Sequence, residues 1–249
     1  MVFLSCLPAD TLSASRRRFR GNQPKQLDEA GAIEVCAIRK FAPDAVNTML
    51  PAGPISVIFN PAAGRGQATR LLKGICRQLP VPIHLCPTRF AGEAVDLARR
   101  AADEGCPVIA AAGGDGTVHE VANGILQSER SESAFMVWPL GSANDYAHAL
   151  GVSQWLRRWK QTPLQLTGVD VGVVRAAGRS RYFVNCLGIG INGHVTYESR
   201  RIRWLRGLPL YGLATVKALW RHFDQPVLKV QVDDHVRETP TLALSVNLG

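Results

Sequence analysis

The residues best suited to chemistry are Gly113-Gly114-Asp115-Gly116-Thr117, which join a short apolar run to a helical pattern. Glycines let a backbone turn sharply and approach a ligand without Cβ collisions. The free N–H groups at the start of the following helix attract anions, aided by the helix dipole. Thr117 is suited to cap that helix and to donate to a phosphate oxygen, and Glu120 stands where a capping-box partner would. A helix cap alone needs no carboxylate among three glycines, so this loop predicts an anion site.

Two further loops follow apolar runs in the same way. Asn60-Pro61-Ala62-Ala63-Gly64-Arg65-Gly66 offers backbone N–H groups, with Arg65 as a phosphate-pairing cation. Pro139-Leu140-Gly141-Ser142-Ala143-Asn144-Asp145 offers the Ser142 hydroxyl to a phosphate, and its Asn and Asp are suited to organise loops or water around a metal. Each loop alone is also explained as a plain turn or a helix cap. Three such loops on adjacent strand ends predict a shared site for the polyphosphate tail of a nucleotide.

The elements that must position these loops form an alternating series. Apolar runs predict buried strands over residues 55–59, 81–85, 108–112 and 135–138, and residues at helical spacing lie between them. Strands that alternate with helices predict a parallel sheet with helices on both faces, which is a three-layer α/β domain. Ligands of such sheets bind beyond the carboxyl ends of the strands. The three loops therefore lie where this architecture places a site.

The sequence pattern changes after about residue 165. Residues 169–174 and 182–187 are typical of strands without a helix between them. Period-2 alternation predicts antiparallel strands over residues 228–232 and 242–246. One helix is expected over residues 208–223. The second half is thus predicted to be a β-rich, antiparallel, sandwich-like domain.

Three segments are expected along the chain. Residues 1–50 lack periodicity and are predicted to form a poorly ordered leader, although the basic cluster at residues 16–20 also suits an arm that touches lipid headgroups or nucleic acid. Residues 51–165 are predicted to form an α/β nucleotide-binding domain, and residues 166–249 part of the β-rich domain. The sequence stops at Gly249 just after a strand, which would leave an open sheet edge, so we expect this second domain to be incomplete.

Several other classes of site are excluded or disfavoured. No G-x-x-x-x-G-K-[ST] run exists, which excludes a P-loop, and Gly64-x-Gly66 lacks the third glycine of the dinucleotide fingerprint. The six cysteines have no C-x-x-C spacing and no accompanying His pair, which argues against a disulfide framework or zinc and favours a reducing cytosol. His119 and His148 lie near the proposed site without a Ser or Cys partner by spacing, so no catalytic triad is expected.

The same motifs resemble a known family. Asn60–Gly64, Gly113–Glu120 and Pro139–Tyr146 resemble, in order and spacing, the diacylglycerol-kinase catalytic-domain family, which includes bacterial diacylglycerol kinases, YegS-type lipid kinases and sphingosine kinases. Asp170–Gly172 and Asn185–Gly190 resemble its second domain. Gly-Gly-Asp-Gly-Thr alone is shared with NAD kinases and 6-phosphofructokinases, so the resemblance depends on the combination of motifs.

The resemblance implies a lipid kinase that transfers the γ-phosphate of ATP to the hydroxyl of a diacylglycerol-like lipid, with Mg²⁺ bridging the phosphates. Asp115 is the implied catalytic residue, whereas the family's general base and metal-site loop would follow Gly249, and the metal ligands stay unknown. Ser142 stands where the family usually has Thr, which keeps the hydroxyl. The alternatives are an NAD kinase-like small-molecule kinase and a truncated, non-catalytic nucleotide-binding remnant. The implied ATP contacts are Asn60, Pro61, Ala62, Ala63, Gly64, Thr88, Gly114, Asp115, Gly116, Thr117, Val118, His119, Glu120 and Ser142.

Charge and hydropathy set the expected partners and location. The net charge of +9 favours nucleotide phosphates or an anionic membrane surface, and a nucleic-acid role has no aromatic or helix-turn-helix support. No apolar run reaches the length of a membrane span. We expect a cytoplasmic protein that meets its lipid substrate peripherally at a membrane, and a homodimer is left open.

Arginines interleaved with Trp over residues 200–206 suit a headgroup interface, whereas the helix over residues 208–223 equally suits burial.

Overall fold

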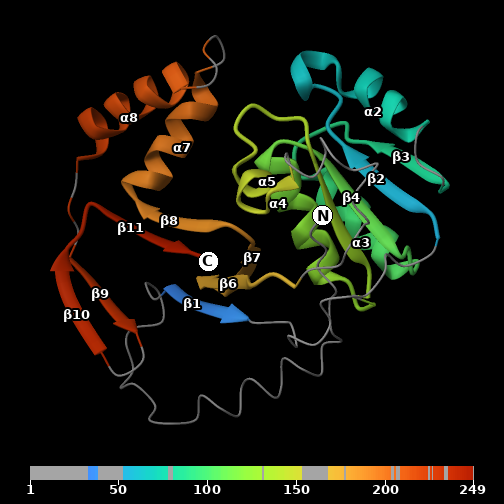
Figure 1. Ribbon diagram of the computed structural model, residues 1–249. Coiled ribbons are helices and arrows are strands. Elements are labelled where there is room, and N and C mark those ends of the chain that lie inside the picture. The colour runs from blue at the N-terminus through green and yellow to red at the C-terminus, as the bar shows by residue number, and fades with distance from the viewer. Residues whose placement is uncertain are drawn as a thin grey trace. The chain divides into compact units, whose positions relative to one another are not determined.

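The computed structural model describes residues 33–38, 53–77, 81–130, 132–152, 168–176, 178–202, 205, 208–223, 225, 227–232 and 235–248. By its contacts the chain forms two compact units, one of residues 1–185 with 248–249 and one of residues 186–247. Figure 1 labels their helices and strands. The chain passes from the first unit to the second after residue 185, whereas the change in sequence pattern begins earlier.

A four-stranded parallel sheet organises the first unit (Figure 1). Its order is β3 (Ile83–Pro87), β2 (Ile55–Phe59), β4 (Val108–Gly113) and β5 (Ala134–Pro139). The register sets Phe59 opposite both Pro87 and Ala112, and Gly113 opposite Pro139. The carboxyl ends of all four strands are therefore level at one edge of the sheet.

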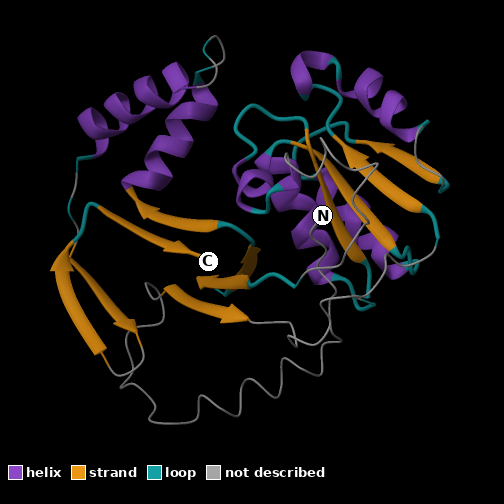
Figure 2. Cartoon of the chain, in the orientation of Figure 1, coloured by secondary structure: helices purple, strands orange, loops and turns teal. Residues whose placement is uncertain are grey.

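Helices cover both faces of this sheet (Figure 2). Successive side chains of a strand point to opposite faces. Ile58, Ile109 and Phe135 therefore pack with α3 (Glu93–Asp103) and α4 (Asp115–Gln127). Val57, Ala110 and Met136 pack on the other face with α2 (Ala68–Cys76), which buries Ala68 and Leu72. The predicted three-layer α/β domain is confirmed.

The first unit also contains a small antiparallel sheet of order β1-β6-β7. Its strands are β1 (Ile33–Ile38), β6 (Val171–Ala176) and β7 (Arg179–Phe183). Strand β1 lies within residues 1–50, where the sequence predicted no strand, and it pairs with β6 along its whole length. The remainder of residues 1–50, including the basic cluster, lies outside the described residues.

The second unit combines antiparallel strand pairs with two helices. Strand β8 (Cys186–Gly190) pairs with β11 (Ala243–Asn247), and β9 (Val227–Val232) pairs with β10 (His235–Pro240). The helices are α7 (Ile191–Arg201) and α8 (Leu208–His222). The predicted antiparallel pairing is confirmed. In the described part of the chain, no helix has the length and apolarity needed to cross a membrane.

Two predictions about residues 182–223 were wrong in detail. The single strand predicted over residues 182–187 is the end of β7 and the start of β8, separated by Val184 and Asn185. Two helices rather than one follow, because Gly190 adopts a positive φ of 78° that turns β8 directly into α7. Helix α7 was missed because its polar residues and internal glycine obscure the helical period.

Close packing of α3 against α4 depends on small side chains. Helix α3 buries Ala94, Ala98 and Ala102. A Cβ placed on Gly124 of α4 would lie 2.3 Å from the carbonyl oxygen of Val95 and 2.6 Å from the Cβ of Ala98. Glycine at this position therefore allows α4 to approach α3 more closely than any other residue would.

We expect Gly124→Ala to destabilise the first unit by about 1–3 kcal/mol, because the added methyl group must push α3 away from α4. Gly74→Ala in α2 is the matched control, since its added Cβ would meet no described atom within 4 Å. This second change is expected to stabilise the protein by roughly 0.5–1 kcal/mol through helix propensity. Urea unfolding measures both effects, and equal stability of the two variants would contradict the close packing.

Candidate functional site

Backbone hydrogen bonds join the three predicted loops at the carboxyl edge of the parallel sheet. The Asn60 N–H donates to the Ala112 carbonyl at 3.3 Å, and the Gly64 N–H donates to the Leu140 carbonyl at 2.8 Å. The Leu140 N–H in turn donates to the Gly113 carbonyl at 2.8 Å. Each loop is therefore bonded directly to a neighbouring strand end or loop.

The closest approach between these loops is a contact of two glycine backbones. A Cβ on Gly141 would lie 2.3 Å from the Cα of Gly114 and 3.0 Å from its nitrogen. A Cβ on Gly114 would lie 3.3 Å from the Cα of Gly141. A side chain at position 141 would thus push the second and third loops apart. The two glycines let main-chain groups of both loops face one small region.

Asn144 holds the third loop in shape. Its backbone is left-handed, with φ 58° and ψ 40°, a conformation that asparagine tolerates better than most residues. Its side-chain Oδ1 accepts from the Gly141 N–H at 2.8 Å, and its Nδ2 donates to the Gly141 carbonyl at 2.9 Å. The predicted role of Asn144 in organising the loop therefore has a structural basis, whereas a role around a metal stays a prediction.

Asp115 is the first residue of α4 and links this helix to α5 (Asp145–Ala149). Its Oδ1 accepts from the Tyr146 N–H at 3.1 Å. A negative charge in the first turn of a helix is favourable because it opposes the positive end of the dipole. The buried Tyr146 hydroxyl makes no hydrogen bond with the described residues, and burial raises its pKa, so Tyr146 serves the site through its backbone.

The N-terminus of α4 has no side-chain cap. Its N-cap residue is Gly114, which has no side chain to accept from the first turn. Thr117 is the third helical residue, and its hydroxyl packs against the Gly113 backbone. The predicted capping roles of Thr117 and Glu120 were therefore wrong, because the helix begins three residues earlier than a Thr117 cap requires. The first N–H groups of α4 have no intrahelical partner and are suited to an anion.

The first loop is shaped by its own backbone and by one side chain. The Asn60 Oδ1 accepts from the Ala62 N–H at 2.9 Å, and the Asn60 carbonyl accepts from the Ala63 N–H at 3.0 Å. Gly64 has a positive φ of 59°. The side chain of Arg65, predicted to pair with a phosphate, lies outside the described part of the chain.

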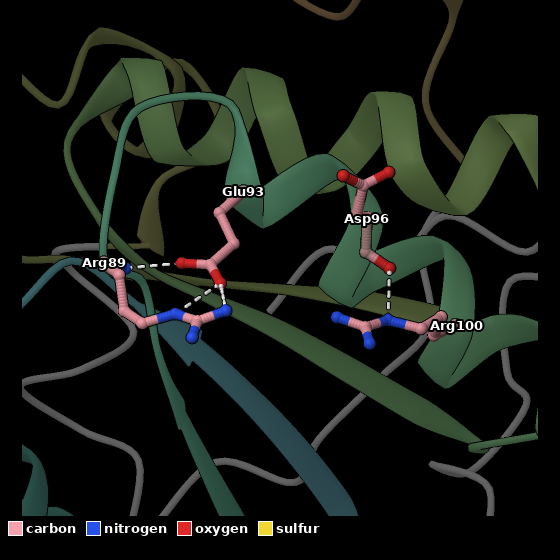
Figure 3. Close-up of polar contacts among 4 residues, drawn as sticks. All are labelled: Arg89, Glu93, Asp96 and Arg100. Atoms are coloured by element: carbon pink, nitrogen blue, oxygen red, sulfur yellow. Dashed lines mark hydrogen bonds and ion pairs between the residues drawn. The ribbon is translucent and has the colours of Figure 1, made fainter.

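Thr88 follows β3, and an ion pair fixes the turn beyond it (Figure 3). The Thr88 N–H donates to the Phe59 carbonyl at 2.9 Å. The Glu93 carboxylate is buried and accepts from the Arg89 Nη2 at 2.6 Å and Nε at 2.9 Å, and also from the Arg89 backbone N–H at 2.5 Å. The guanidinium hydrogen bonds hold the pKa of Glu93 below its ordinary value, and the backbone bond adds to this effect.

Asn123 anchors α4 to the small antiparallel sheet and was missed in the sequence. It is buried, and its Nδ2 donates to the Tyr182 carbonyl at 2.9 Å while its Oδ1 accepts from the Tyr182 N–H at 3.0 Å. The signal in the sequence was an amide within the apolar helical pattern formed by Val121, Ala122 and Ile125. These two hydrogen bonds pair the Asn123 side chain with the β7 backbone as a neighbouring strand would. They fix the direction of α4.

The predicted ATP contacts differ in their exposure to solvent, and most of them are partly exposed. Asn60, Gly116 and Ser142 are exposed at the edge where the loops meet. The side chain of Val118 instead lies in the hydrophobic core, and its N–H donates to the Gly114 carbonyl. Within the described residues, no group of three or more His, Cys, Asp or Glu could hold a metal ion. The ATP contacts as a set stay a prediction.

A family comparison covers all of these loops. The model of the diacylglycerol kinase catalytic domain matches residues 54–174. This match spans 121 of the 249 residues, just under half of the chain. The resemblance inferred from the three loops is confirmed, and the matched stretch also contains β6, which lies beyond them.

Similar proteins extend the comparison beyond this domain. A protein of Chromohalobacter salexigens named "Probable lipid kinase YegS-like" is 32% identical over 204 residues, which are 79% of this chain and 63% of that protein. A diacylglycerol kinase of Bacillus subtilis is 32% identical over 149 residues, which are 57% of this chain and 47% of that protein. A crystal structure attributed to a diacylglycerol kinase of Bacillus anthracis has a TM-score of 0.56 and 27% identity, and covers 78% of this chain and 65% of the other. The chain spans less than two thirds of the length of these relatives.

The lowered pKa of Glu93 predicts acid sensitivity of the turn after Thr88. Its contribution to stability is fully present above the unfolded pKa of about 4.3, and is lost as the pH falls through the lowered folded value. Glu93→Gln abolishes this titration, so the parent protein should lose more stability on acidification than the variant. Urea unfolding at a series of pH values measures the difference. Glu104→Gln, at the exposed end of the same helix, is the control, and an unchanged pH dependence in Glu93→Gln would contradict the assignment.

Proposed function

We propose that this chain contributes the nucleotide-binding part of a lipid kinase, which transfers the γ-phosphate of ATP to the hydroxyl of a diacylglycerol-like lipid. The observation that carries this proposal is the contact of Gly114 and Gly141 beside the uncapped first turn of α4. The match of residues 54–174 to the diacylglycerol kinase catalytic domain supports the reaction class. The names of the YegS-like and Bacillus subtilis relatives support a lipid acceptor.

Main-chain groups are the proposed phosphate ligands. The first N–H groups of α4 carry the positive end of the helix dipole and have no intrahelical acceptor. The exposed hydroxyl of Ser142 and the Asn60–Gly64 loop flank them at the same sheet edge. Phosphoryl transfer depends chiefly on positioning and charge neutralisation, so a rigid cradle of this kind suits the reaction.

Asp115 is the proposed acidic group of the site. Its Oδ1 is engaged by the Tyr146 N–H, while its Oδ2 makes no hydrogen bond with the described residues and is suited to a water or a metal ion. Protein-bound Mg²⁺ commonly uses one or two carboxylates together with substrate phosphates, so a single Asp fits such a site. Mg²⁺ would supply positive charge to the phosphates. Asp115, which the Tyr146 N–H holds at a defined position, would orient the Mg²⁺ ion or a water molecule bound to that ion.

The lipid acceptor sets the proposed location. A kinase of lipids must reach a substrate that resides in a membrane, and the net charge of +9 favours an anionic surface. We therefore propose peripheral encounter with the membrane from the cytoplasm.

Asp115→Asn is expected to lower Mg²⁺-dependent transfer by about 100-fold or more, because the charge is lost where phosphate charge must be neutralised. It should leave stability nearly unchanged, since the amide oxygen still accepts from the Tyr146 N–H. Asp115→Ala should lose transfer and also about 1 kcal/mol of stability with that hydrogen bond. The measurements are transfer of labelled γ-phosphate to a lipid extract and urea unfolding, with Glu104→Gln as the control.

Other outcomes of the same assays select other functions. Wild-type turnover in Asp115→Asn would refute the role of its charge. Phosphorylation of NAD without any lipid product would identify a small-molecule kinase instead. Binding of ATP without turnover in the whole natural protein, with an active lipid kinase as positive control, would identify a non-catalytic nucleotide-binding protein.

A further inference from the structure

Strand β1 precedes the part of the chain that matches the diacylglycerol kinase catalytic domain, yet it pairs with a strand inside that part. The match begins at residue 54, whereas β1 ends at Ile38. All six residues of β1 are in antiparallel register with β6 (Figure 1), with Ile33 opposite Ala176 at one end. Because the sheet order is β1-β6-β7, this pairing makes β6 the central strand. Without β1, the backbone groups along one side of β6 would be unpaired.

Strand β7 connects β6 to helix α4. Gly172 of β6 lies opposite Phe183 of β7, and a Cβ on Gly172 would lie 2.1 Å from the Phe183 ring, so the two strands fit closely. The N–H and carbonyl of Tyr182, the neighbouring residue of β7, both bond the Asn123 side chain of α4. A shift of β6 would therefore strain or break the hydrogen bonds between β7 and α4.

Apolar packing holds the same elements together. Val171, the first residue of β6, and Val184, which directly follows β7, belong to one cluster of buried residues. Val118 and Val121 of α4 belong to the same cluster. Protein interiors are close-packed, so elements that share a core do not move independently. The small sheet thus holds α4 both through Asn123 and through this core.

The first turn of α4 carries the proposed phosphate ligands. It follows Gly114, and a Cβ on Gly141 would lie 2.3 Å from the Gly114 Cα. A contact this close leaves little room for a rotation or translation of the helix. Binding groups must be held to within about 0.5 Å of their productive positions. The contacts that fix the middle of α4 at Asn123 therefore affect the geometry at its N-terminus.

We propose that β1 is a positioning strand for the nucleotide site: it pairs with β6, holds β7 in place and, through the Asn123–Tyr182 hydrogen bonds, fixes the phosphate-binding turn of α4. Asn123 is a positioning residue in this arrangement, because its amide bonds the backbone of β7 and acts on the site through α4. The proposal rests on the proposed binding of ATP at that turn. It adds that a segment preceding the matched domain controls the affinity for the nucleotide, although no residue of β1 is a predicted ATP contact.

The test disrupts the pairing of β1 in the full chain. Val35→Pro/Cys36→Pro removes two consecutive backbone donors, and in an antiparallel pair alternate residues form the hydrogen bonds, so one ladder position is always affected. Val35→Thr/Cys36→Thr is the matched control, because it keeps both backbone donors and suits a strand. Arg237→Pro/Glu238→Pro makes the same backbone change in β10 of the second unit.

Two measurements are made on these variants. In Val35→Pro/Cys36→Pro, we expect the dissociation constant of a fluorescent ATP analogue with Mg²⁺ to rise about fivefold or more. Amide exchange should accelerate about tenfold or more at Tyr182 and at Val118, whose N–H donates to the Gly114 carbonyl, while β4 exchanges as in the parent protein. Both control variants should match the parent protein at these positions and in nucleotide affinity.

A double-mutant cycle tests whether β1 acts through Asn123. Asn123→Ala should also weaken binding of the ATP analogue, and combining it with Val35→Pro/Cys36→Pro should give less than the product of the two effects, because both act on the same contact. Asn123→Asp keeps the acceptor for the Tyr182 N–H and replaces Asn123→Ala if the latter does not fold. Fully independent effects would contradict the role of Asn123.

The outcomes separate this proposal from the kinase function. Unchanged amide exchange of β6 in Val35→Pro/Cys36→Pro, or faster exchange of β6 without any change at Tyr182 and Val118, would overturn the proposal. Unchanged nucleotide affinity would overturn it as well, and acceleration that extends equally to β4 would make β1 a general stabilising strand. If the parent protein binds no ATP analogue, the proposed function fails, while the exchange at Tyr182 and Val118 still decides whether β1 positions α4.

Discussion

The candidate site depends on the approach of two main chains, at Gly114 and Gly141. Neighbouring strands of a sheet lie about 4.8 Å apart, and β4 and β5 end level because Gly113 pairs with Pro139. The loops that leave these ends would be separated by any side chain at position 141, since its Cβ would meet the Cα of Gly114. Two glycines therefore convert adjacent strand ends into one continuous backbone surface. The Leu140 hydrogen bonds extend that surface to the Asn60–Gly64 loop.

Helix α4 connects this surface to the rest of the first unit. Its N-terminus lies at the loops without a side-chain cap, and its middle is buried against the sheet and α3. Asn123 binds the β7 backbone with both of its amide groups, and Asp115 binds the backbone at the start of α5. Buried hydrogen bonds of this kind are costly to leave unmade. The direction of the helix dipole is thus set by contacts on several sides.

In the second unit, helix α8 packs on α7 with its large apolar side chains exposed to solvent. A surface helix normally buries its large apolar residues and exposes polar ones. Helix α8 does the reverse, because alanines pack inside and the Glu198–Arg221 and His194–His222 contacts hold its polar end on α7.

The sequence by itself determined the parallel sheet, its helices and the identity of the three loops, because buried strands are continuous apolar runs and turns need glycine or asparagine at specific places. It did not reveal β1, β10 or α7, whose exposed or polar residues carry little periodicity. It also placed the cap of α4 at Thr117, because local spacing cannot show where the first helical turn begins. Only the tertiary structure decided that Gly141 meets Gly114, that Asp115 binds Tyr146 and that Asn123 binds Tyr182. Those residues are far apart in the chain, and their contacts exist only once strand register and helix packing bring them together.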